Sequence, residues 1–292
     1  MQKIVPCLWF DSEGEEAVDF YIKTFGEGKI LNTSRYAADT PSNKPIGSVM
    51  TIEFEINGLK LMVLNGGPIF KLNQSISFFV LCKPQEIDGL WEKLSVGGSA
   101  LMPLGKYPFS ERYGWLQDKY GVSWQLMVET EKTDQKIIPS LLFVGNVYGR
   151  AHEAMDLYAS LFENSKVNQI SYYPNGDPQE GKITYAQFEL HGEKFVVMDS
   201  GFAHKFSFNE VVSFVIYCND QEEINYFYDK LSADPKAEIC GWIKDKFGVS
   251  WQLVTIGFEK LMTGKNAKKV TEELLKMKRL DIKKLQEAYE SA

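Results

Sequence analysis

The chain has 292 residues, of which 44% are hydrophobic and 24% charged, with a formal net charge of −7. This composition is typical of a folded globular protein and excludes disordered and collagen-like classes. An acidic chain lacks the lysine and arginine clusters that neutralise nucleic-acid phosphates, so we expect no nucleic-acid partner. Its apolar runs are shorter than the roughly 20 residues of a membrane helix, so we expect no membrane partner.

The first half of the chain predicts a strand, a helix and three further strands. Ile4 to Phe10 is rich in β-branched and aromatic residues, as a strand is. Ser12-Glu13-Gly14-Glu15 fits the S-x-x-E capping box that begins a helix. Three strands follow, the last two joined by the hairpin signal Asn57-Gly58; they are Lys29 to Arg35, Ser48 to Ile56 and Leu59 to Leu64.

The same order of elements is predicted a second time before residue 130. Ile87, Leu90, Trp91 and Leu94 recur at helical spacing, with Gly97-Gly98 as the stop. Strand signals surround this helix at Ser75 to Cys82, Leu101 to Tyr107, Gly114 to Lys119 and Ser123 to Val128. The order is therefore β-α-β-β-β, twice.

The second half of the chain repeats the first. QKIVPCLWF (Gln2 to Phe10) returns as QKIIPSLLF (Gln135 to Phe143), and GWLQDKYGVSWQLM (Gly114 to Met127) returns as GWIKDKFGVSWQLV (Gly241 to Val254). This is a tandem duplication. We predict an α+β fold of four β-α-β-β-β modules, with one domain at 1–130, a second at 131–256 and a helical tail at 257–292 that packs on the second unit.

These blocks, with LMVLNGG, VVMDSG and the tail segment MKRLDIKKLQEAY, resemble the vicinal oxygen chelate superfamily of glyoxalase, bleomycin resistance and extradiol dioxygenase proteins. More narrowly, the chain is similar to its PhnB-like branch, described as 3-demethylubiquinone-9 3-methyltransferase-like. The resemblance covers nearly the whole chain. It implies two cup-shaped eight-stranded sheets, each built from two modules. It also implies that the two units pair within the chain, in place of the homodimer of single-unit relatives; a further homodimer is left open.

Enzymes of the superfamily hold a divalent metal in the cup. The resemblance places ligands on the first strand, where Val5 and Ile138 stand, and on a later strand of each cup, where serine stands in place of histidine. A further ligand of the superfamily is a carboxylate in the segment that closes each unit, here DKYGVSWQL and DKFGVSWQL. Gln125 and Gln252 stand at its position. We therefore expect a degenerate metal site and no cofactor.

A divalent metal held by Gln252, Asp199 and His204 is the alternative. Asp199 corresponds to Asn65 in the first copy, and a role in the turn after the strand is the simpler interpretation. Cys7 has no histidine or carboxylate placed to activate it, so buried packing is the simpler interpretation. No glycine-rich turn joins a strand to a helix as in a nucleotide-like cofactor site, so the methyltransferase label is not taken as an activity.

The sequence therefore favours a small-molecule-binding protein whose ligand is hydrophobic or aromatic. We expect the ligand-binding residues among Cys7, Trp9, Trp115, Gln117, Gln125, Trp242 and Gln252. An atypical metal-dependent lyase, isomerase or dioxygenase is the alternative. A third hypothesis is that one cup is only structural, because the copies differ at Cys7 versus Ser140.

The cysteines and the first ten residues give an expectation for the subcellular location of the protein. Cys7, Cys82, Cys218 and Cys240 are far apart and show no C-x-x-C spacing. The opening MQKIVPCLWF lacks the basic and apolar regions of a secretory signal. We therefore expect reduced thiols and a cytoplasmic location.

Overall fold

The computed structural model describes residues 2–129 and 133–291. The first module contains β1 (Ile4–Phe10), α1 (Gly14–Phe25), β2 (Gly28–Arg35), β3 (Val49–Ile56) and β4 (Leu59–Asn65). The second contains β5 (Ile76–Cys82), α2 (Ile87–Ser95), β6 (Ser99–Tyr107), β7 (Ser110–Gln117) and β8 (Ser123–Val128). The predicted β-α-β-β-β order is confirmed in both.

The second half follows the same plan with one difference. The third module contains β9 (Ile137–Phe143), the 3-10 turn η1 (Gly145–Val147), α3 (Ala151–Leu161), β10 (Lys166–Tyr172), β11 (Ile183–Leu190) and β12 (Glu193–Asp199). The fourth contains β13 (Val212–Cys218), α4 (Gln221–Leu231), β14 (Trp242–Lys244) and β15 (Ser250–Thr255), so its described residues have one strand fewer after the helix. The tail forms α5 (Phe258–Thr263), α6 (Ala267–Leu274) and α7 (Ile282–Glu290).

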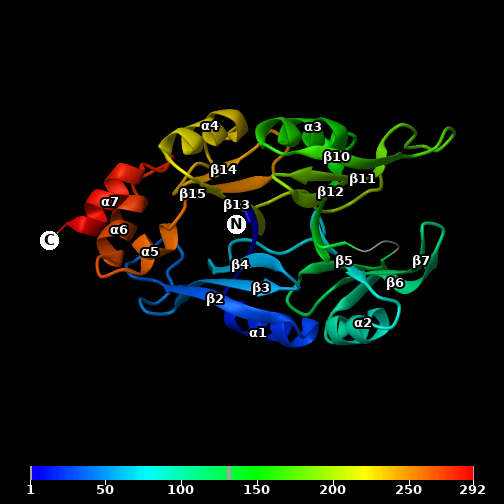
Figure 1. Ribbon diagram of the computed structural model, residues 1–292, viewed down its shortest axis with the longest axis horizontal. Coiled ribbons are helices and arrows are strands. Elements are labelled where there is room, and N and C mark those ends of the chain that lie inside the picture. Colours follow the sequence, from blue (N-terminus) through cyan, green and yellow to red (C-terminus); the bar gives the residue numbers. More distant parts are fainter. Residues whose placement is uncertain (1, 130–132, 292) are drawn as a thin grey trace.

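Each of the two sheets combines one module from each half of the chain (Figure 1). Sheet A has the order β14-β15-β13-β1-β4-β3-β2, and sheet B has the order β10-β11-β12-β9-β5-β8-β7-β6. The halves join where β1 pairs antiparallel with β13 and β9 pairs antiparallel with β5. The predicted α+β fold is confirmed. In the described residues sheet A has 7 strands, not the predicted eight, because the fourth module has one strand fewer.

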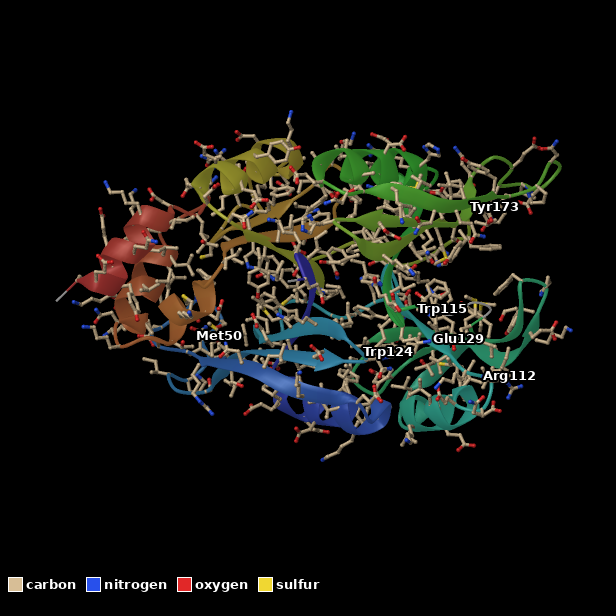
Figure 2. All side chains as sticks on the ribbon, viewed as in Figure 1. Met50, Arg112, Trp115, Trp124, Glu129 and Tyr173 are labelled. Atoms are coloured by element: carbon tan, nitrogen blue, oxygen red, sulfur yellow. The ribbon has the colours of Figure 1, made fainter. Side chains whose placement is uncertain are left out.

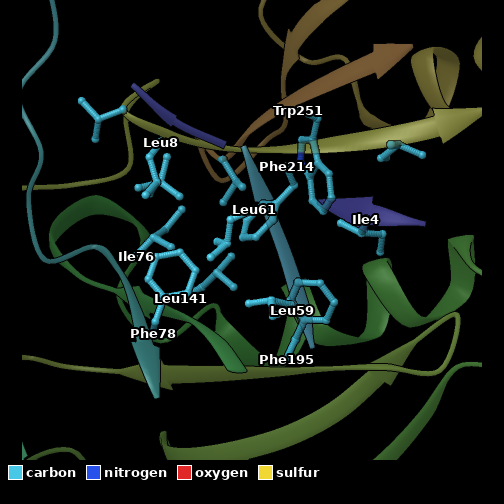
Figure 3. Packing of buried hydrophobic residues seen from close by; sticks show 14 of the residues in the cluster. Ile4, Leu8, Leu59, Leu61, Ile76, Phe78, Leu141, Phe195, Phe214 and Trp251 are labelled. Carbon is cyan, nitrogen blue, oxygen red and sulfur yellow. The ribbon is translucent and has the colours of Figure 1, made fainter. Parts of the chain in front are cut away.

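One continuous core joins the two sheets to each other and to the helices that cover them. Along β3, Ile52, Phe54 and Ile56 are buried against α1, so the alternate residues Thr51 and Glu53 face the concave side. Figure 3 shows buried side chains of β1, β4, β5, β9, β12, β13 and β15 packed together. Each such side chain contributes roughly 1.5–3 kcal/mol through burial.

The beginning of α1 corrects one prediction. No side chain caps this helix in the way the Ser12 capping box predicts. Instead, Asn65 Oδ1 accepts a hydrogen bond of 2.9 Å from the Gly14 N–H, because Asn65 lies beside Phe10 in the parallel pair of β1 and β4. A Cβ on Gly14 would lie 2.6 Å from that oxygen, so a larger residue here would displace the Asn65 side chain.

The repeated segment DK(Y/F)GVSWQL, which begins at Asp118 and again at Asp245, has a structural role in both halves. Asp118 is buried and accepts hydrogen bonds from Tyr21 Oη at 2.9 Å and Trp124 Nε1 at 2.8 Å. The same arrangement recurs in the second copy around Asp245, with Tyr158 at 2.6 Å and Trp251 at 2.9 Å. Burial raises the pKa of both aspartates, and the hydrogen bonds offset part of that shift.

The C-terminal helices cover the concave side of sheet A (Figure 1). Backbone hydrogen bonds from Cys240 N to Met277 O, 2.8 Å, and from Gly241 N to Lys278 O, 2.9 Å, attach the tail to the fourth module. Helix α5 also contacts β2 of the first module, so the tail reaches both halves rather than only the second unit as predicted. Among residues 2–129 and 133–291, no helix is both long and apolar enough to cross a membrane.

Candidate functional site

Sheet A and the tail enclose a cavity of about 410 Å³, which we call cavity A. Its lining is mostly apolar. The concave strands contribute Met50, Met62, Leu64, Val215 and Val254, and the tail contributes Phe258, Met262, Leu274 and Leu275. A cavity of this size and chemistry accommodates a small organic molecule.

Aromatic rings form one wall of cavity A. Trp9 of β1 and Trp242 of β14 meet edge to face with ring centroids 6.0 Å apart, and Phe70 meets Trp9 at 5.1 Å. Trp9 Nε1 donates to Gly67 O at 2.8 Å. A Cβ on Gly66 would lie 2.3 Å from the Trp9 ring, so this glycine lets the indole lie against the backbone.

Three strands of sheet A, β3, β13 and β15, place hydrogen-bonding side chains at the wall of cavity A. Glu53 accepts a hydrogen bond from Tyr217 Oη. Burial and the neighbouring carboxylate raise the pKa of Tyr217 well above its ordinary value, so its phenol stays protonated. Gln252 Nε2 donates to Ser213 Oγ at 2.9 Å. These groups can accept and donate hydrogen bonds within a largely apolar space.

Cys7 is buried on the same concave face, next to Ser213 and Gln252. Burial raises its pKa to about 12, and the contacts with Gln252 and Ser213 offset part of the shift. A thiol with this pKa is protonated at neutral pH and is a poor nucleophile and metal ligand.

The concave face of sheet B is filled by side chains. Phe79, Tyr113, Ile138 and Val196 are buried there, and the residues packed around them include Tyr107, Trp115 and Tyr185. By the internal repeat, Phe79 occupies the position of Val215, Tyr113 that of Cys240 and Tyr185 that of Thr51. At these three positions sheet B carries an aromatic residue where sheet A carries a smaller one.

The structure divides the predicted ligand-binding residues between the sheets. Trp9, Trp242 and Gln252 line cavity A, and Cys7 packs on the same face of sheet A. Trp115, Gln117 and Gln125 belong to sheet B, where their side chains bond to Ser123 Oγ at 2.7 Å, Gly121 O at 2.8 Å and Ser77 Oγ at 2.7 Å, respectively. Figure 2 shows Met50 beside the C-terminal helices and Trp115 in the other sheet.

Sequence reasoning missed Glu53, Tyr217 and the tail residues Phe258 and Met262. The alternation along β3 was the available signal for Glu53, since it is the charged residue between buried Ile52 and Phe54. No local pattern indicates that the tail closes a cavity of sheet A.

The alternative metal ligands are not brought together. Asp199 Oδ1 accepts from the Gly149 and Ala151 N–H groups at 2.8 and 3.2 Å, and its Oδ2 accepts from Ile183 N at 3.1 Å. His204 contacts Ser200 Oγ at 2.8 Å on the loop after β12, whereas Gln252 lies in sheet A.

Within residues 2–129 and 133–291, no three His, Cys, Asp or Glu side chains are grouped to hold a metal. On the concave face of sheet A, the protonated thiol of Cys7, the hydroxyl of Ser213 and the amide of Gln252 lie together. This donor set does not fit a divalent cation, which prefers carboxylate or imidazole ligands.

Sheets formed from paired β-α-β-β-β modules around concave faces define the vicinal oxygen chelate fold. Glyoxalase I from Zea mays has this fold: it superposes with a TM-score of 0.57 over 88% of this chain and 94% of that chain, at 12% identity. The chain belongs to the 3-demethylubiquinone-9 3-methyltransferase family, whose sequence profile matches residues 2–127 and again 135–254.

Other solved structures match a little under half of the chain, among them two bacterial proteins. The PhnB protein from Bacillus cereus is 40% identical over 44% of this chain and 100% of that chain, with a TM-score of 0.41. Protein PA1353 from Pseudomonas aeruginosa is 25% identical over 44% of this chain and 98% of that chain, with a TM-score of 0.38. No functionally curated protein matches the sequence.

Proposed function

We propose that the protein binds one small, largely apolar, planar molecule per chain, in cavity A. The observation that carries this proposal is the contrast between the two concave faces. Sheet A surrounds about 410 Å³ with an aromatic wall and a few polar groups, whereas the matching face of sheet B is packed with aromatic side chains. Aromatic rings with a small number of hydrogen-bonding groups are the usual lining of ligand sites.

The family description refers to methyl transfer, and we do not extend it to this chain. A nucleotide-like cofactor would use the free N–H groups at a strand–helix turn. At α1 the Gly14 N–H is bonded to Asn65, and at α3 the Gly149 and Ala151 N–H groups are bonded to Asp199. A metal-dependent lyase, isomerase or dioxygenase is the other candidate, and the donors in sheet A give it no support.

Titration with N-phenyl-1-naphthylamine, a neutral dye that fluoresces in apolar surroundings, tests the proposal. We expect saturable emission with one site per chain. Val215→Phe places in sheet A the residue that sheet B carries as Phe79, so it fills cavity A and weakens binding at least tenfold. Leu81→Phe adds comparable bulk to the concave side of sheet B and leaves the affinity within twofold.

Thermal unfolding establishes that both variants are folded. Unchanged dye affinity in folded Val215→Phe, or a loss confined to Leu81→Phe, would overturn the proposal.

A further inference from the structure

We propose that cavity A is selective for organic cations, in which an apolar, preferably aromatic body carries an ammonium group that Glu53 receives. This inference rests on the proposed binding function and names the chemical class of its ligand.

Glu53 is a half-buried carboxylate on the wall of an apolar cavity. It lies on β3 between Asn32 and Met62 of the neighbouring strands, and its one hydrogen bond among the described residues comes from Tyr217. No lysine, arginine or histidine in residues 2–129 and 133–291 forms an ion pair with it. Because a carboxylate partly removed from water is stabilised by a cation, a ligand's ammonium group would supply what the chain does not.

Tyr217 prepares Glu53 for this role. Its phenol remains protonated and donates to Glu53 Oε1, which fixes the orientation of the carboxylate. Oε2 has no hydrogen-bond partner among the described residues. One carboxylate oxygen is therefore held by the protein while the other remains available.

The charged residues around cavity A are mainly acidic. Glu210 is paired with Lys244 at 2.6 Å, whereas Glu53 and Glu259 form no ion pair among the described residues. The lysine that lines the cavity, Lys236, is exposed, and Lys60 lines a smaller adjoining hollow with Glu53 and Glu259. Carboxylates beside low-dielectric walls create a negative potential that favours cations over anions.

The aromatic wall adds a second attraction. The faces of indole and phenyl rings carry negative electrostatic potential and attract ammonium groups within about 6 Å of the ring centroid. Trp9, Trp242 and Phe70 all line cavity A, so the same wall suits both the apolar body and the charge of an aromatic amine.

The duplication provides an internal comparison. By the repeat, Glu53 corresponds to Gln187 and Tyr217 corresponds to Leu81, both in sheet B. The carboxylate and the phenol that holds it therefore occur in the sheet with the cavity, whereas an amide and an aliphatic residue stand in the filled sheet. The presence of Gln187 also shows that the fold accepts glutamine at this position, which makes Glu53→Gln a suitable variant.

Three probes with one ring system test the inference by isothermal titration at pH 7. They are 1-naphthylmethylamine, a cation; 1-naphthalenemethanol, which is neutral; and 1-naphthaleneacetate, an anion. We expect the cation to bind at least tenfold more tightly than the alcohol, and the anion to bind most weakly. Glu53→Gln should lower the affinity for the cation about tenfold and leave that for the alcohol within twofold.

Glu55→Gln is the matched control, because Glu55 lies two residues along the same strand but pairs with Lys29 at 3.6 Å and does not line cavity A. It should leave all three affinities within twofold. If the alcohol binds in cavity A as tightly as the amine, or if Glu53→Gln does not change the preference, the selectivity is wrong while the binding function stands. If none of the probes binds at millimolar concentration, the binding function itself fails and the selectivity fails with it.

Discussion

Trp9 and Trp242 meet edge to face, with ring centroids 6.0 Å apart and ring planes inclined by 75°. They come from the first strand of the first module and the short β14 of the fourth. Their contact follows from the pairing of β1 with β13, which joins the two halves of the chain in sheet A. Cavity A is therefore a product of both halves.

The two halves offer a matched pair of tryptophan variants. Trp242→Phe should weaken binding of 1-naphthalenemethanol about threefold to tenfold, because an aromatic contact is worth about 0.5–1.5 kcal/mol. Trp115→Phe, at the equivalent position of sheet B, should leave the affinity unchanged. Isothermal titration of both variants measures this, and equal losses from the two would contradict the assignment of the site to sheet A.

The native protein should react slowly with thiol reagents. Burial raises the pKa of Cys7, Cys82 and Cys218 to about 12 and that of half-buried Cys240 to about 11. At pH 8 the thiolate fraction of the first three is about 10³-fold below that of a free cysteine. We expect Cys240 to react first with 5,5′-dithiobis(2-nitrobenzoate), and all four cysteines to react at once in urea. Rapid labelling of Cys7 in the folded state, located by mass spectrometry, would contradict this prediction.

Glu193 should make stability depend on pH. It is half-buried, accepts hydrogen bonds from Lys3 N and Ile4 N at 2.5 and 3.3 Å, and desolvation raises its pKa from 4.5 to about 7. Between these two pKa values the folded state keeps a proton that the unfolded state releases. The contribution of Glu193 to the free energy of unfolding therefore falls as pH rises from about 4.5 to about 7 and then stays constant.

The fall attributable to Glu193 is at most about 3 kcal/mol. Urea titrations of the wild type and Glu193→Gln at pH 5, 6, 7 and 8 isolate this term. The stability of the variant relative to the wild type should increase from pH 5 to about pH 7 and then level off. A constant difference would show that Glu193 titrates alike in the folded and unfolded states.

Tyr158→Phe should destabilise the protein without affecting the ligand. Tyr158 is fully buried and donates a 2.6 Å hydrogen bond to Asp245, so its removal leaves a buried acceptor short of one partner. The expected loss is about 1.5–3 kcal/mol in the free energy of unfolding. Tyr21→Phe removes the equivalent bond to Asp118 and should cost a similar amount. A loss of dye binding at full stability would instead indicate a functional role for the motif.

Much of the local structure is determined by the sequence alone. The hairpin at Asn57-Gly58 forms as predicted, with φ of 46° and 80° at the two residues, which is the left-handed backbone that this pair favours. The strand that begins at Ile4 and the helix that follows it were likewise visible, because periodicity and turn chemistry act over a few residues. The repeat itself then indicated the fold class.

Only the tertiary structure decided how the modules pair and which concave face remains open. Both sheets are built from the same repeated strand sequences, so the pattern along a strand does not show whether the side chains opposite one another fill the space or leave a cavity. That outcome depends on residues distant in sequence, such as Val215 in sheet A against Phe79 and Tyr185 in sheet B. The helix start at Gly14 is also completed from a distance, by Asn65, and the tail closes cavity A through long-range packing. Local patterns do not contain these contacts, because each depends on where the folded chain brings two remote segments together.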